Sequence, residues 1–148
     1  VPATVILVAA LIILYFFLRP VKIVSTVREW NEGYFFVDNF PMTAKARIAW
    51  WEENKEVLKK KYNMPFIGSD KQWTVLIGEA GDGFQFLQHR ASDNDLICFD
   101  SLKPGANCAE KKWLLWISHY NQTDTSFLTG DSKYIQRGDN AKIKRVAD

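Results

Sequence analysis

An uninterrupted apolar run at the start of the chain constrains its fold more than any other feature. Residues 1–18 (VPATVILVAALIILYFFL) carry no charge, and Thr4 is the one hydrophilic side chain among them. As a helix with a rise of about 1.5 Å per residue, the run would be roughly 27 Å long, close to the ~30 Å hydrocarbon thickness of a bilayer. Arg19 and Pro20 end the run. The sequence therefore predicts a transmembrane anchor over residues 1–19, which meets the lipid bilayer through residues 1–18.

Two other kinds of segment resemble such a run. A cleaved signal peptide also has an apolar stretch, but its cleavage site needs small residues, and here the bulky segment 15–19 (YFFLR) stands in that place. A helix buried in a soluble core is normally apolar on one side, whereas this run is apolar on every face. We therefore expect a membrane anchor rather than either alternative.

The cations after the run bear on the side of the membrane where residues 20–148 lie. Arg19, Lys22 and Arg28 follow the apolar run, and the positive-inside rule applied to them alone puts the domain in the cytoplasm. The chain has no initiator Met, and we expect further residues ahead of Val1 whose charges would compete with these three. The cations alone do not fix the orientation.

The two cysteines favour a position of the domain outside the cytoplasm. The chain has two cysteines, Cys98 and Cys108, with nine residues and a Pro-Gly pair between them. A disulfide that closes such a loop contributes about 2–3 kcal/mol and persists in the periplasm or outside the cell. Two reduced cysteines in a core are the alternative. Two thiols alone are too few for a structural zinc site, which takes four ligands.

The charge balance limits the classes of partner. The chain has 148 residues, of which 24% are charged, and its 19 basic and 17 acidic side chains leave a net charge of +2. A surface of mixed sign gives no strong field for gathering phosphates. We therefore expect no nucleic-acid partner.

Beyond the apolar run, the pattern indicates short strands and one helix. Residues 21–27 and 33–37 are typical of a hairpin, and Thr43 can cap an amphipathic helix over residues 44–62. Further runs predict strands at 73–78, 84–88, 96–99, 113–120, 126–128, 134–137 and 143–146. We predict an α+β fold: one N-terminal transmembrane helix, then a small antiparallel β-sheet domain over residues 20–148 with one packed amphipathic helix.

Catalytic and metal-binding motifs are not apparent. The chain contains no phosphate-binding loop, nucleophile elbow, HExxH or CxxC pattern. Glu79, Asp82 and His89 would lie near one another if they flank a hairpin, and they are the best candidates for hydrolytic acid–base chemistry. We expect no catalytic residues, no metal and no cofactor, so the sequence predicts that the protein is not an enzyme.

Two adjacent tryptophans are more informative. Trp50 and Trp51 cannot face the same way on a helix. One of them should therefore meet a second surface, which is a partner, the bilayer or a neighbouring loop.

Several short elements together resemble the enterobacterial membrane-protein family known as domain of unknown function 943. They are Arg19-Pro20-Val21, Val37-Asp38-Asn39-Phe40-Pro41, Ile48-Ala49-Trp50-Trp51-Glu52-Glu53-Asn54-Lys55, Leu58-Lys59-Lys60-Lys61-Tyr62, Gly81-Asp82-Gly83, and Cys98-Phe99-Asp100 with Cys108 and Glu110-Lys111. The resemblance implies a single-pass protein of the bacterial inner membrane, with a basic extreme N-terminus and a periplasmic C-terminal domain. It implies no catalytic residues.

These observations lead to a functional expectation. We expect a membrane-anchored periplasmic module that binds another protein, in the form of an immunity protein that neutralises an envelope-acting toxin of an interbacterial secretion system. The candidate partner-binding residues are Trp50, Glu52, Glu53, His89, Arg90, Asp93 and Asp95.

Two alternatives remain open. One is an accessory subunit of an inner-membrane complex, in which Ala3, Ala9 and Ala10 supply small residues for helix contacts without forming a GxxxG pattern. The other is an envelope hydrolase that uses Glu79, Asp82 and His89.

Overall fold

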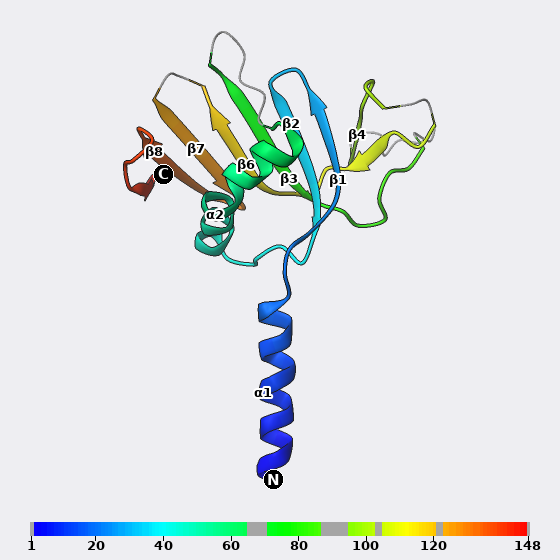
Figure 1. The fold of residues 1–148 in the computed structure, drawn as a ribbon, viewed down its shortest axis with the longest axis vertical. Coiled ribbons are helices and arrows are strands. Elements are labelled where there is room, and N and C mark those ends of the chain that lie inside the picture. Colours follow the sequence, from blue (N-terminus) through cyan, green and yellow to red (C-terminus); the bar gives the residue numbers. More distant parts are fainter. Residues whose placement is uncertain (1, 65–70, 87–94, 103–104, 121–122, 148) are drawn as a thin grey trace.

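The computed structural model describes residues 2–64, 71–86, 95–102, 105–120 and 123–147. Figure 1 shows helix α1 (Ala3–Leu18) projecting from a head that contains a β-sheet and helix α2 (Ala44–Tyr62). Large apolar side chains of α1 are exposed, among them Val5, Leu11 at 56%, Leu14 at 51% and Leu18. The head therefore leaves the apolar surface of α1 uncovered.

The predicted N-terminal transmembrane helix is wrong. Helix α1 has 16 residues, which at about 1.5 Å per residue gives roughly 24 Å, shorter than the ~30 Å hydrocarbon layer. Among the described residues, no helix reaches the length and apolarity needed to cross a membrane. The prediction counted all of residues 1–18 as helical, whereas Pro2 is extended and α1 begins at Ala3.

The head is built around one seven-stranded sheet in the order β1-β2-β3-β6-β7-β8-β9. Its strands are β1 (Lys22–Glu29), β2 (Glu32–Asp38), β3 (Trp73–Glu79), β6 (Trp113–His119), β7 (Asp124–Thr129), β8 (Ser132–Arg137) and β9 (Ile143–Arg145). A smaller antiparallel sheet contains β4 (Leu96–Cys98) and β5 (Cys108–Glu110). The predicted first hairpin is confirmed, because β1 pairs antiparallel with β2.

The sheet is mixed, and the prediction of a purely antiparallel sheet is wrong. Strands β2 and β3 run parallel, with Tyr34 opposite Leu76. Helix α2 returns the chain to the end where β2 began, so β3 starts beside the start of β2. The predicted strand at 84–88 is also not found as such, because Gln85 makes one isolated bridge to Cys108 and residues 87–88 lie outside the described residues.

Helix α2 occupies the predicted residues and packs on the sheet as expected. The Thr43 hydroxyl accepts a hydrogen bond from the Ala46 N–H at 3.2 Å and caps the first turn. Ile48, Trp51 and Leu58 are buried on the sheet side. Asn63 takes a left-handed conformation and ends the helix.

Arg47 fixes the start of α2 to the sheet. Its Nε donates to the Pro41 carbonyl at 2.7 Å, and its Nη1 donates to the Leu114 carbonyl and to the Thr129 hydroxyl, each at 2.9 Å. Burial lowers the pKa of the Arg47 guanidinium, which nevertheless stays charged because arginine is so basic. These three bonds set the position from which α2 crosses the sheet.

Two apolar clusters cover the two faces of the sheet. The first lies under α2 and includes Phe35, Trp51 and Leu115. The second lies under the β4–β5 hairpin and includes Phe36 and Phe99. Side chains alternate along a strand, so the consecutive residues Phe35 and Phe36 of β2 serve opposite clusters.

The predicted disulfide is confirmed. Cys98 and Cys108 are bonded to each other and occupy paired positions on β4 and β5. The bond therefore holds together the hairpin that covers the second cluster.

Candidate functional site

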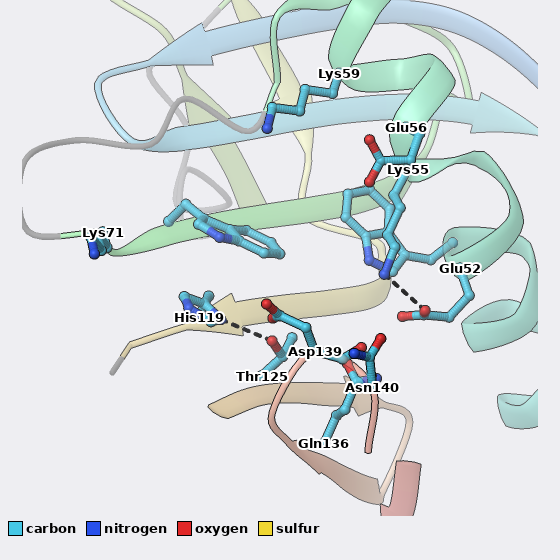
Figure 2. A pocket seen from close by; sticks show the side chains of 12 residues that line it. Glu52, Lys55, Glu56, Lys59, Lys71, His119, Thr125, Gln136, Asp139 and Asn140 are labelled. Carbon is cyan, nitrogen blue, oxygen red and sulfur yellow. Dashed lines mark hydrogen bonds and ion pairs between the residues drawn. The ribbon is translucent and has the colours of Figure 1, made fainter. Parts of the chain in front are cut away.

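A pocket of about 610 Å³, here called the α2 pocket, lies between α2 and the sheet. Figure 2 shows its side chains converging from α2, from the strands and from the turn between β8 and β9. The residues that line it are Trp51, Glu52, Lys55, Glu56, Lys59, Lys71, Trp73, His119, Thr125, Gln136, Asp139 and Asn140.

The α2 pocket lies at the end of the sheet remote from α1. Strand β1 leaves α1 at Lys22 and reaches the remote end at Glu29, which pairs with Glu32 at the start of β2. Glu32 pairs in turn with Thr74 of β3. Trp73, the first residue of β3, pairs with His119, the last residue of β6. The sheet register therefore separates the pocket from α1 by the length of the strands (Figure 1).

Aromatic rings form one wall of the pocket. The rings of Trp73 and His119 stack with their centroids 5.5 Å apart and their planes 7° from parallel. The Trp51 ring lies 6.1 Å from Trp73, tilted by 39°. A hydrogen bond of 2.9 Å joins His119 Nδ1 to the buried Thr125 hydroxyl and fixes the orientation of the imidazole. This wall is preorganised by the core beneath it.

Charged and amide side chains form the remaining walls. Lys55 and Glu52 of α2 form an ion pair of 2.9 Å, with both side chains about one-third exposed. Opposite them, the Gln136 amide donates to the carbonyls of Asp139 at 3.3 Å and Ala141 at 3.0 Å, and so holds the β8–β9 turn. In Figure 2 the Asp139 carboxylate lies between this turn and the aromatic wall.

The pocket combines aromatic and charged side chains. Its lining includes three carboxylates and three lysine ammonium groups, so charges of both signs stand beside a rigid aromatic surface. Among the described residues, no group of three or more His, Cys, Asp or Glu side chains is placed to hold a metal ion. Three aromatic rings thus stand among nine charged, amide and hydroxyl side chains, which can offer a ligand a stacking surface and several polar contacts.

The comparison with protein families covers almost the whole chain. Residues 1–147 match the family described as "Enterobacterial putative membrane protein (DUF943)". The chain belongs to this family. The resemblance found in its short sequence elements is therefore confirmed. No curated protein and no solved structure matches the chain.

The predicted partner-binding residues do not gather at one place. Glu52 lines the α2 pocket, Glu53 is exposed on α2 outside it, and Asp95 is exposed just before β4. The Trp50 ring packs on Phe40 at 5.3 Å, so the second surface that this tryptophan meets is a neighbouring loop. His89, Arg90 and Asp93 lie outside the described residues. Partner binding by these residues stays a prediction.

The residues proposed for hydrolysis are not brought together within the part of the chain that is described. Glu79 ends β3 at the α1 end of the sheet, Asp82 is exposed in the turn after it, and His89 lies outside the described residues. Neither carboxylate lines the α2 pocket.

Sequence reasoning missed most of the pocket. Trp73 and His119 are at the ends of two predicted strands, but their contact depends on a register that the sequence does not state. Asp139 and Asn140 were visible only as turn residues. The one usable signal was that Trp73 and His119 lie near the ends of their predicted strands, which suggests a surface and not a site.

Proposed function

We propose that the protein is a membrane-associated binding module of the bacterial envelope, and that its head holds a segment of a protein partner in the α2 pocket. The observation that carries this proposal is the preorganised stack of Trp73 on His119 inside an open, charge-lined pocket. Rigid aromatic side chains are common anchors of protein recognition. The protein then acts by binding and not as an enzyme.

The charges that line the pocket indicate which kind of ligand it can bind. Cations and carboxylates line the pocket in equal number, which favours a peptide segment that carries charges of both signs over a polyanion. Complementary charges at such a site contribute mainly to specificity and to the rate of association.

The proposal puts the head on the periplasmic side of the inner membrane, with α1 in contact with lipid. Its support is the Cys98–Cys108 disulfide, since such bonds persist in oxidising compartments, and the uncovered apolar side chains of α1. The family is one of membrane proteins by its description.

The compartment can be tested by thiol labelling in intact cells. We expect Cys98 and Cys108 to resist a membrane-permeant maleimide until a reductant is added, because their sulfurs are bonded to each other. Labelling without reductant would contradict the periplasmic assignment. A variant with both cysteines changed to serine gives the background signal.

The specific role proposed within this class is that of an immunity protein, which covers the active cleft of a toxin that acts in the envelope. Membrane association supports this role, because it confines inhibitor and toxin to a thin layer and raises the frequency of their encounters. The alternative is that the protein is an accessory subunit of an inner-membrane complex. Its partner would then be another subunit of that complex and not a toxin.

Partner binding can be tested by photo-crosslinking in cells. A photoreactive amino acid at Asn140 should capture one protein, and the double change E56A/D139A should reduce capture about tenfold, as expected for the loss of roughly 1.4 kcal/mol of polar contacts. The matched control is E53A/D131A, which removes two exposed acids outside the pocket. A captured toxin, with protection of the expressing cells, supports immunity, and a captured membrane subunit without protection rejects it. Equal capture by both double variants would contradict binding in the α2 pocket.

A further inference from the structure

A second cavity, here called the junction groove, lies where α1 meets the head. Its volume is about 640 Å³. Leu11, Leu14 and Leu18 of α1 form an apolar wall, and Arg19, Lys22 and Asn39 form a polar rim. The groove lies at the opposite end of the sheet from the α2 pocket, and its lining shares no residue with that pocket.

The rim of the junction groove is cationic. Arg19 and Lys22 line it and no acidic side chain does. Asp38 is the cross-strand partner of Lys22 but does not line the groove. Within the described residues, none of the ion pairs involves Arg19 or Lys22. Arg19 also lines a neighbouring cavity together with Asp38 and Glu79, but neither acid lines the junction groove.

The Arg19 guanidinium lies close to aromatic side chains at the end of α1. The Arg19 guanidinium lies 6.0 Å from the centroid of the Tyr15 ring and 5.7 Å from that of Phe16. The charge therefore lies beside the aromatic side chains of the last turn of α1. Aromatic and basic side chains at the end of an apolar helix are typical of the boundary between lipid and water.

We propose that the junction groove binds one anionic phospholipid. An acyl chain lies along Leu11, Leu14 and Leu18, where its burial is favourable. The phosphate meets Arg19 and Lys22, and arginine matches phosphate geometry with two parallel hydrogen bonds. The order of apolar wall and cationic rim along the groove is the order of acyl chain and headgroup along a phospholipid. A free phosphate would use the rim alone.

The headgroup contacts can be tested with the full chain in detergent micelles. Native mass spectrometry with added phosphatidylglycerol should show one bound lipid per chain, and phosphatidylcholine should be retained far less. The double change R19Q/K22Q should lower phosphatidylglycerol occupancy roughly thirtyfold, as expected for two lost cation–lipid contacts. The matched control K45Q/K60Q removes two exposed cations of α2 that do not line the groove, and it should bind as the parent does.

The acyl-chain contact needs a separate variant. Leu14→Trp fills the groove while keeping α1 apolar, and it should reduce lipid retention. Ile13→Trp places the same side chain at a position of α1 that does not line the groove, and it should leave retention unchanged. Circular dichroism verifies that both variants keep the helix.

Three results would overturn the proposal: equal retention of the two lipids, unchanged retention by R19Q/K22Q, or binding of inorganic phosphate as tight as that of phosphatidylglycerol. None of these results bears on partner capture at Asn140. The lipid site and the proposed function can therefore fail independently.

Discussion

Tyr34 is a buried residue whose protonation links the stability of the head to pH. Burial raises the pKa of the Tyr34 phenol well above its usual range, and the hydrogen bond that its hydroxyl donates to the Glu32 carboxylate raises it further. The folded chain therefore keeps this proton where the unfolded chain, with an ordinary tyrosine pKa of about 10, releases it. The stabilisation is complete below that pH and declines as the pH rises above it.

Tyr34→Phe should make the protein less sensitive to alkali. We expect the melting temperature of the parent to fall more steeply than that of the variant above about pH 10, because the variant has no phenol to ionise. At pH 8 the variant should be less stable by about 1 kcal/mol, through the lost hydrogen bond. Thermal melts followed by circular dichroism across this range measure both effects. Parallel curves for the two proteins would contradict the expectation.

The two adjacent tryptophans show what can be read from single residues. Their neighbouring positions on a helix required different surroundings, and the structure agrees. Trp51 is 2% exposed on the sheet side of α2, while Trp50 packs on Phe40. The nature of the second surface was not predictable. It depends on how the loop before α2 folds back, and that loop is positioned by the bonds of Arg47 to three separate segments.

At the scale of the element, the cap of α2 should contribute measurably to stability. We expect Thr43→Ala to lower the free energy of unfolding by about 1 kcal/mol, because the Ala46 N–H loses its acceptor. Thr43→Ser keeps a hydroxyl at the same place and should retain most of the stability. Urea unfolding of the two variants and the parent provides the measurement. An equal loss in both variants would show that the methyl group matters rather than the cap.

Helices and strands that have a clear local sequence pattern could be predicted. The way in which the strands pair was harder to predict. Helix α2 was foreseen from its apolar spacing and from Thr43, and the first hairpin from a turn between a β-branched run and a second apolar run. The parallel pair of β2 and β3 was not foreseen, because it results from where α2 returns the chain. The length of α1 was overestimated at its N-terminal end, because Pro2 is extended and lies outside the helix although hydropathy alone would include it.

At the scale of the molecule, the α2 pocket could not be read from the sequence because five segments build it. They are α2, the start of β3, the end of β6, the start of β7, and the end of β8 with its following turn. No single one of these segments carries a sequence pattern that indicates a pocket. Only the sheet register and the crossing of α2 bring the Trp73–His119 stack opposite Asp139. The disulfide, by contrast, could be predicted from the sequence, because only a short loop separates the two cysteines.

On the proposed contact of α1 with lipid, the opposite placement of α1 and the α2 pocket sets a minimum reach for any partner that is tethered to the same lipid layer. Strand β6 has seven residues and therefore raises the pocket on the order of 20 Å above the junction with α1. A tether in extended form gains about 3.3 Å per residue. A lipid-linked ligand with fewer than about six residues before its recognition segment would fall short, whereas one arriving from across the compartment would meet no such restriction.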